Sequence, residues 1–191
     1  MSKIRLLVVG AGGHGRSVLE AAELSAQFEV VDLLDDSLPA GDGVMGVTLL
    51  GPVISMARHH AGADQAIVAV GNNTVREKLL PQLAAVGIMR ATVVHPRAIV
   101  SPSAVLGAGS AVMAGAIVGT EARLGVSSIV NCGAVVDHHA TVEDFGHLGV
   151  NASMAGGTVL GLGAWMQAGA ALGYGVAAGE VLLPGAARES K

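Results

Sequence analysis

A dense group of polar side chains lies between residues 131 and 151 of this 191-residue chain. Three of the seven histidines, His138, His139 and His147, fall within ten residues of one another, and Asn131 precedes them. An imidazole with an unperturbed pKa of about 6.5 can accept a proton near neutral pH. The group therefore predicts a general base whose tautomer is held by a neighbouring carboxylate or by a second imidazole.

A zinc site is the alternative use of the same side chains, because three imidazoles and a water molecule suit a catalytic Zn²⁺. His138 and His139 are adjacent in the chain, and adjacent side chains on a strand point to opposite faces. We therefore expect only one of the two to face any single site. A zinc site would also leave the glycine-rich loop near the N-terminus without a role, so we predict no metal.

That glycine-rich loop is the second candidate site. Gly10, Gly12 and Gly15 match the pattern G-x-G-x-x-G between an expected strand and an expected helix. The N–H groups of such a loop, together with the positive end of the helix dipole, favour an anionic phosphate. We therefore predict that Gly12, Gly13, His14 and Gly15 contact a phosphorylated substrate.

Two further expected strands are followed by polar or flexible residues, namely Asp35, Asp36, Gly71, Asn72 and Asn73. Ligands of open α/β sheets bind beyond the carboxyl ends of the strands, so we expect these residues to contact the base, ribose or phosphate. Arg76 follows one helical turn later, where it either pairs with a phosphate or covers the helix surface. Binding of a dinucleotide would need a second mononucleotide half, which the chain lacks, so a single nucleotide or a nucleotide sugar is favoured.

A six-residue repeat predicts the elements that must position the histidines. Every sixth residue from Val100 to Leu172 is aliphatic or Met, over thirteen consecutive hexads. An amphipathic helix has an apolar period of about 3.6, so the pattern instead predicts a parallel β-helix of hexapeptide repeats. Three hexads make one triangular coil, and the aliphatic residues stack inside it. The repeat fades after Leu172.

The N-terminal part of the chain follows a different pattern. We expect strands at Ile4–Val9, Phe28–Leu34, Val47–Leu50, Ala66–Val70 and Ala91–Val94, alternating with helices at Ser17–Ser25, from about Pro52, and at Thr74–Val86. Alternating strands and helices predict a small parallel sheet of the Rossmann type. The predicted boundary near His95-Pro96 divides the chain into an α/β domain, residues 1–95, and a β-helix domain, residues 96–191.

Composition narrows the function classes. The single cysteine, Cys132, cannot form an internal disulfide and suits a reducing cytosol. The net charge of −4 and the lack of a basic run argue against nucleic acid as a partner. No apolar stretch reaches the ~18 residues of a membrane span. We expect a cytoplasmic protein that does not insert into membranes.

In this order along the chain, the motifs resemble those of the bacterial PglD/NeuD-like sugar acetyltransferases. The resemblance rests on the loop from Val9 to Gly15, on Asp35-Asp36, Gly71-Asn72-Asn73 and His95-Pro96, and on hexads that carry Asn131, His138 and His147. It covers nearly the whole chain, and it implies that the β-helix is left-handed.

The resemblance also implies a function. It implies a homotrimer that transfers acetyl from acetyl-CoA to the amine of a UDP-4-amino-sugar, in surface glycan or glycoprotein sugar biosynthesis. His138 maps onto the catalytic base, His147 onto a residue near the acetyl carbonyl, and Asn131 onto a polar site residue. The coenzyme is expected at His147, Ala168 and Gly169, and the UDP on the N-terminal domain. The alternatives are an O-acetyltransferase acting on sialic acid or another sugar hydroxyl, and a non-catalytic nucleotide-sugar-binding scaffold.

One position departs from the family pattern. The family commonly has an acidic residue directly after the catalytic histidine, and this chain has His139 there. The group that orients His138 is therefore left open: Asp137, Glu143 or Asp144 replaces the missing acid, or His139 itself does so.

Overall fold

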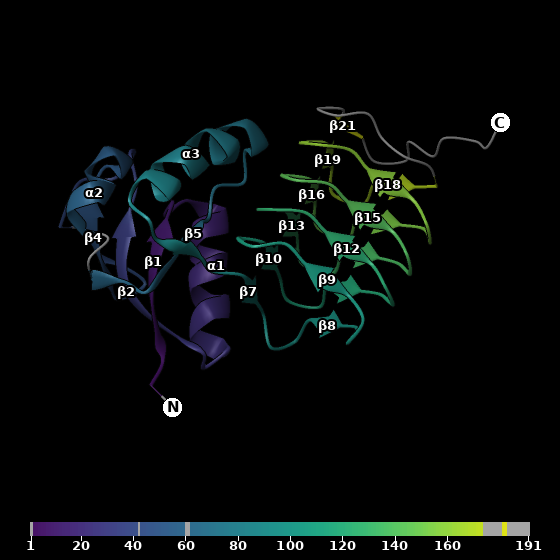
Figure 1. Ribbon diagram of the computed structural model, residues 1–191, viewed down its shortest axis with the longest axis horizontal. Helices are drawn as coiled ribbons and strands as arrows, with labels where there is room; N and C mark the ends of the chain where they lie inside the picture. The colour runs from purple at the N-terminus through teal and green to yellow at the C-terminus, as the bar shows by residue number, and fades with distance from the viewer. Residues whose placement is uncertain (1, 42, 60–61, 174–180, 183–191) are drawn as a thin grey trace. The chain divides into compact units, whose positions relative to one another are not determined.

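The computed structural model describes residues 2–41, 43–59 and 62–173, and the backbone of residues 181–182. The chain divides into two compact units, the first ending at Val93 and the second beginning at Val94. Figure 1 shows that the first is an α/β unit and that the second is a stack of short parallel strands. Within the described residues, no helix is long and apolar enough to cross a membrane.

The first unit is built on a six-stranded sheet. Its strands lie in the order β3 (Gly43–Val44), β4 (Val47–Gly51), β2 (Phe28–Leu34), β1 (Ile4–Val9), β5 (Gln65–Val68) and β6 (Met89–Arg90). Its helices are α1 (Gly13–Leu24), the 3-10 turn η1 (Val53–Ser55), α2 (Met56–His59) and α3 (Asn73–Ala85). Only the pairing of β3 with β4 is antiparallel among the strand pairs described. The predicted alternation of strands and helices is therefore confirmed.

The last predicted strand of this unit, Ala91–Val94, is wrong. The first sheet ends with β6 at Arg90, and Val93–Val94 instead form β7, which spans the boundary between the units and belongs to the sheet of β10 and β13. A short apolar, β-branched run fits either sheet equally well, so its composition does not say which neighbour it pairs with. The hairpin strand β3 was not predicted, because two residues are too few to show a period.

Strand β1 is the central element of the first unit. Leu6, Leu7, Val8 and Val9 are fully buried, as expected for a parallel strand covered on both faces. The chain adds β2 and β4 on one side of β1 and then crosses to add β5 on the other. In open α/β sheets, ligands usually bind at such a reversal, at the carboxyl ends of the strands, which here are β1 and β5.

The second unit is a left-handed parallel β-helix with three faces, as expected. The β16 face contains β7 (Val93–Val94), β10 (Ala111–Val112), β13 (Ile129–Val130), β16 (His147–Leu148), β19 (Trp165–Met166) and β21 (Val181–Leu182). The β17 face contains β8 (Ile99–Val100), β11 (Ile117–Val118), β14 (Val135–Val136), β17 (Ser153–Met154) and β20 (Ala171–Leu172). The β18 face contains β9 (Val105–Leu106), β12 (Arg123–Leu124), β15 (Thr141–Val142) and β18 (Val159–Leu160).

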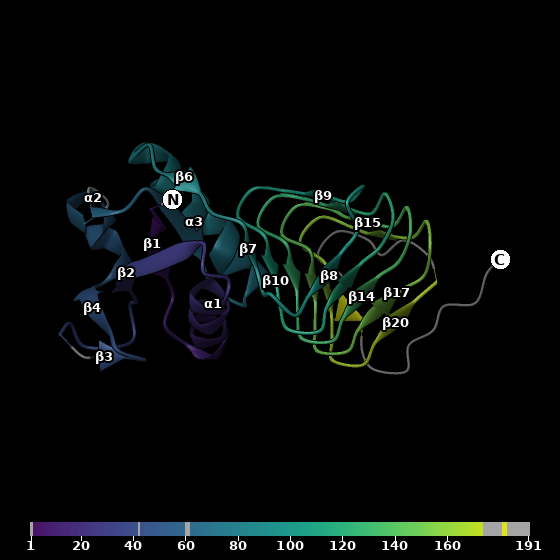
Figure 2. The same cartoon turned by 90° about the horizontal axis from the view of Figure 1, so that it is seen from below.

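The predicted hexad repeat is confirmed, because each of its thirteen aliphatic or Met residues ends a strand of the β-helix. Residues from Val112 to Leu172 in the series pack inside the prism with the small residues of its corners. One coil is 18 residues long, since Val135 pairs with Ser153 on the next coil. Figure 2 shows the coils stacked along the axis of the β-helix. The hexad repeat is expected to fade after Leu172, and most of the residues after that point lie outside those described.

Three columns of stacked turns join the faces. The histidine corner joins the β17 face to the β18 face through turns 101–104, 119–122, 137–140 and 155–158. The asparagine corner joins the β16 face to the β17 face through turns that include 131–134, 149–152 and 167–170. The third corner joins the β18 face to the β16 face and includes 125–128, 143–146 and 161–164. Residues 18 apart therefore lie next to each other in a column.

Candidate active site

The glycine loop closes tightly on one side and is open on the other. Gly10 has a φ of +107°, and its N–H donates to the carbonyl of Leu34 at 2.7 Å. A side chain on Gly15 would collide with the carbonyl of Gly10, whereas one on Gly12 or Gly13 would meet no atom within 4 Å. Gly15 thus allows α1 to pack against the loop, and Gly12 and Gly13 face open space.

The start of α1 is suited to an anion. Helix α1 begins at Gly13, and its N-cap residue Gly12 provides no side-chain hydrogen bond to the first turn. The first N–H groups of a helix have no partner within the helix, and they carry the positive end of its dipole. The geometry therefore supports the predicted contacts of Gly12, Gly13, His14 and Gly15 with a phosphate.

The two acids at the end of β2 support the loop. Asp35 accepts hydrogen bonds from the Ala11 N–H at 2.7 Å and from the Ser37 N–H and hydroxyl at 2.8 and 2.5 Å. Burial alone would raise the pKa of Asp35, but these hydrogen bonds outweigh it and hold the pKa below its ordinary value. Asp36 is exposed, and it accepts from the Val53 N–H at 2.7 Å at the start of η1. Asp35 therefore holds the glycine loop in place, which the sequence did not reveal.

The segment after β5 lies beside the glycine loop. A Cβ on Gly71 would be 3.8 Å from the Cβ of His14. Asn72 caps α3 by accepting from the Val75 N–H at 3.0 Å. The side chain of Asn73 accepts from Nη2 of Arg76 at 2.9 Å. The structure thus brings Gly71, Asn72 and Asn73 to the same edge as Gly10–Gly15, but it uses both amide side chains to build that edge.

Arg76 neither lies on the surface of the helix nor is exposed to pair with a phosphate; it is a buried structural residue. Its side chain is only 1% exposed, and its Nη1 donates to the carbonyls of Val70 and Gly71 at 2.9 and 3.3 Å. Burial lowers the pKa of Arg76 to about 10. Desolvation, helped by the charge of Arg76, lowers the pKa of His14 to about 4, so His14 is neutral at pH 7. The guanidinium holds the segment after β5 instead of covering the surface of the helix.

His138 and His139 lie together at the histidine corner, and our expectation that they point apart on a strand is wrong. They occupy a turn, where His139 has a φ of +60°, so the alternation of a strand does not apply. Their Nδ1 atoms are 3.0 Å apart. The His138 side chain is 60% exposed, and Asp137 lies beside it, accepting from the His138 N–H at 2.7 Å.

Neighbouring coils supply two site residues that sequence reasoning missed. Glu121 approaches His139 from one coil before, with its Oε2 3.0 Å from the Nε2 of His139. Gly156 lies one coil after His138, and a Cβ there would come within 2.5 Å of the His138 Nε2. Both lie 18 residues from the histidine they contact. The 18-residue length of the coil could therefore have predicted both contacts from the sequence.

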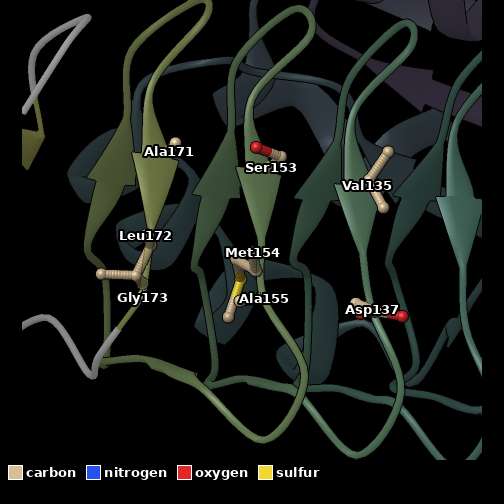
Figure 3. Close-up of a pocket in the computed structure, with 8 residues that line it drawn as sticks. All are labelled: Val135, Asp137, Ser153, Met154, Ala155, Ala171, Leu172 and Gly173. Atoms are coloured by element: carbon tan, nitrogen blue, oxygen red, sulfur yellow. The ribbon is translucent and has the colours of Figure 1, made fainter. Parts of the chain in front are cut away.

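A groove runs along the β17 face and ends at the histidine corner. It encloses about 370 Å³ and is lined by Val135, Asp137, Ser153, Met154, Ala155, Ala171, Leu172 and Gly173. Figure 3 shows Val135, Ser153 and Ala171 on successive strands, with Asp137 beyond the end of β14. The small side chains of Ser153 and Ala171 leave room for a narrow, extended ligand that ends at Asp137, the residue before His138.

The other predicted residues of the β-helix do not all meet His138. Asn131, Ala168 and Gly169 lie at the asparagine corner, which forms the opposite edge of the β17 face. His147 belongs to β16, where it is 5% exposed and stacks on Trp165 with ring centroids 5.3 Å apart. In a three-sided prism the β16 face is opposite the histidine corner. One protomer therefore does not bring His147 to His138.

Two of the acids considered as partners of His138 are too far along the coil. Glu143 and Asp144 lie at the third corner, where they accept from the N–H groups of Leu162 and Val126 at 2.7 Å. Asp137 does contact His138, with 3.8 Å between its Oδ2 and Nε2. Among the described residues, no group of three or more His, Cys, Asp or Glu side chains could hold a metal ion.

The chain is similar in sequence and in fold to known proteins. Residues 5–83 match the model of the PglD N-terminal domain. A curated relative is the UDP-N-acetylbacillosamine N-acetyltransferase of Bacillus subtilis (strain 168), with 34% identity over 109 residues, or 56% of this chain and 50% of that protein. The chain thus spans about half the length of the curated relative it matches.

Solved structures extend the likeness to both units. The acetyltransferase domain of PglB from Neisseria gonorrhoeae FA1090, in complex with acetyl coenzyme A, is 34% identical with a TM-score of 0.88, over 94% of this chain and 88% of that one. PerB from Caulobacter crescentus, in complex with CoA and GDP-perosamine, is 32% identical with a TM-score of 0.76, over 96% of this chain and 91% of that one. The chain therefore belongs to the PglD/NeuD-like family of sugar acetyltransferases.

Proposed function

We propose that this protein transfers the acetyl group of acetyl-CoA to the amine of a UDP-4-amino-sugar, in surface glycan or glycoprotein sugar biosynthesis in the cytoplasm. The observation that carries the proposal is the exposed His138 imidazole, which directly follows Asp137 at the end of the β17-face groove. An extended thioester in the groove places its carbonyl near the ring, where an incoming amine can lose a proton to a general base.

The reaction needs no covalent intermediate on the enzyme. The amine nitrogen attacks the thioester carbonyl carbon, the C–N bond forms and the C–S bond breaks. His138 removes the proton of the amine, and the CoA leaves as a thiol once it has gained a proton. Orientation and a base are sufficient for this aminolysis, and backbone N–H groups near the carbonyl stabilise the oxyanion.

The nucleotide is proposed to bind to the first unit. The start of α1, which has no side-chain cap, suits the diphosphate, and the carboxyl ends of β1 and β5 suit the nucleoside. Asp35 and Asn72 then act mainly by holding the loops that contact the ligand, because their side chains already bond to backbone N–H groups. Asp36 is exposed at the end of β2, and only its Oδ1 is used by the Val53 N–H, so its Oδ2 is the oxygen we propose for the base or ribose.

We further propose a homotrimer in which a neighbouring protomer completes the site. His147 lies on the face opposite the histidine corner, so it reaches an acetyl group near His138 only from another copy of the chain. A contact between two different surfaces is head-to-tail, and it closes into a ring when the rotation allows. Asn131, Ala168 and Gly169 border the β17 face and are proposed as contacts of the coenzyme.

A measurement of CoA-thiol release tests the proposal. The purified protein is given acetyl-CoA and, in separate reactions, UDP-4-amino-sugars, GDP-perosamine and sialic acid. We expect release of the thiol with a UDP-4-amino-sugar and mass-spectrometric detection of the N-acetylated product. Release only with GDP-perosamine would contradict the choice of UDP, release only with sialic acid would favour O-acetylation, and none with any acceptor would favour a binding scaffold.

A further inference from the structure

The position after His138 holds a second histidine, His139, and both of its ring nitrogens face a polar side chain. Nδ1 of His139 faces Nδ1 of His138 at 3.0 Å, while Nε2 of His139 faces Oε2 of Glu121 at 3.0 Å. The two rings are nearly perpendicular, at 84°. The three side chains thus form a continuous row, from the carboxylate of one coil to the base on the next.

With both imidazoles neutral, this row determines where the protons lie. A carboxylate only accepts, so the Nε2 of His139 must carry the proton that points at Glu121. The Nδ1 of neutral His139 is then an acceptor, and the facing Nδ1 of His138 must be the donor. His138 is then left with an unprotonated Nε2, which is the form a general base needs. Asp137 does not place a proton there, because its Oδ2 is 3.8 Å from Nε2, too far for a hydrogen bond.

We infer that Glu121 is a positioning residue that acts through His139 to hold His138 as the tautomer with a free Nε2. The inference rests on the proposed role of His138 as the base. It replaces the acid that commonly follows the catalytic histidine with a relay of two side chains. When His138 accepts a proton, the negative charge of Glu121 also stabilises the imidazolium through His139.

The coil itself positions Glu121. Its φ of +58° and the φ of +60° at His139 mark equivalent places in stacked turns. The Glu121 N–H donates to the Ser103 hydroxyl at 3.0 Å, and the His139 N–H donates to the Thr120 carbonyl at 2.9 Å. The left-handed conformation recurs in the turns of the other corners, as at Phe145 and Asn151, so the coil itself imposes it on Glu121 and His139. The Glu121 and His139 side chains are 61% and 60% exposed, so their pairing contributes little to stability.

The test compares kcat and KM in a double-mutant cycle. Glu121→Gln allows the amide to donate to His139, which permits the wrong tautomer in both rings. We expect kcat to fall about 10- to 100-fold, with both KM values unchanged. His139→Glu puts a carboxylate directly beside His138, so this variant should retain activity, and adding Glu121→Gln to it should have no further effect. Glu143→Gln, an acid at the third corner, is the matched control and should leave kcat unchanged.

A second measurement does not depend on turnover. Nitrogen-15 NMR of histidine-labelled protein reports which ring nitrogen of His138 carries a proton. We expect Nδ1 protonated in the wild type and a mixture of tautomers in Glu121→Gln. A wild-type His138 protonated on Nε2, or an equal loss of kcat from Glu121→Gln with and without His139→Glu, would overturn the inference. If no amino sugar is a substrate, the proposed function fails, yet the NMR result still decides the role of Glu121.

Discussion

The imidazole of His138 lies directly over Gly156, one coil further along the β-helix, so that a Cβ at that glycine would come within 2.5 Å of Nε2. Any side chain at position 156 would therefore displace the His138 ring. The missing side chain at Gly156 therefore allows the His138 ring to occupy its position. The backbone of Gly156 does not have a left-handed φ, so its conformation alone does not require a glycine there.

The first prediction follows from that contact. Gly156→Ala should displace the ring and lower kcat by about 100-fold, because a misplacement of about 1 Å at a reacting group can have that effect. The adjacent Gly157 has a φ of +73° and no atom within 4 Å of an added Cβ, so Gly157→Ala should lower stability by about 1 kcal/mol and spare kcat. Steady-state kinetics and thermal unfolding measure both. Equal kcat in the two variants would contradict the assignment.

The second prediction concerns His138 itself. His138→Ala should lower kcat by about 10²- to 10⁴-fold, as expected for the loss of a general base. The side chain is exposed, so the melting temperature and the affinity for acetyl-CoA should stay close to those of the wild type. Calorimetric titration with CoA and a turnover assay check the two parts. Near-normal turnover would remove His138 from the mechanism.

The third prediction separates the two units by their ligands. Gly13→Val should raise KM for the nucleotide sugar about 10- to 100-fold, because the side chain covers the N–H groups proposed to hold the phosphate. KM for acetyl-CoA should not change. Gly43→Val, on β3, is the matched control, since a Cβ there also meets no atom within 4 Å. A rise in KM for acetyl-CoA alone would show that the glycine loop serves the coenzyme instead.

The fourth prediction tests whether protomers share a site. His138→Ala and His147→Ala should each be nearly inactive alone. Co-expressed in a 1:1 ratio, they should regain activity, since about one quarter of randomly formed interfaces would hold both histidines. A site within one protomer would never contain both, so a mixture as inactive as its components would show that His147 does not act across an interface.

The fifth prediction is a dependence of stability on pH through His14. The native pKa of about 4 lies below the ordinary histidine pKa of 6.5, so between these values the unfolded state binds more protons than the native state. The free energy of unfolding should therefore fall as the pH falls from 6.5 to 4, by at most about 3 kcal/mol from this residue. Urea unfolding of His14→Gln should show a smaller loss over this range, whereas parallel curves for variant and wild type would contradict the burial of His14.

The sequence alone determined most of the fold. The hexads marked every strand from β8 to β20, because each short strand uses the same inward position and the pattern is entirely local. The 18-residue length of the coil also predicts that Glu121 lies next to His139 and that His138 lies next to Gly156, because residues one coil apart stack. The glycine loop was recognisable because steric limits on a tight turn before a helix leave few residue choices.

Only the tertiary structure decided how the polar side chains are used. Asp35 bonds to Ala11, Asp36 bonds to Val53, and Arg76 is buried under the loop after β5. Each residue type could equally have faced a ligand, and the choice depends on which backbone groups the packed sheet leaves without partners. His139 is the clearest case. Its place beside His138 follows from a turn with left-handed backbone, whereas the alternation of a strand would have pointed the two rings apart.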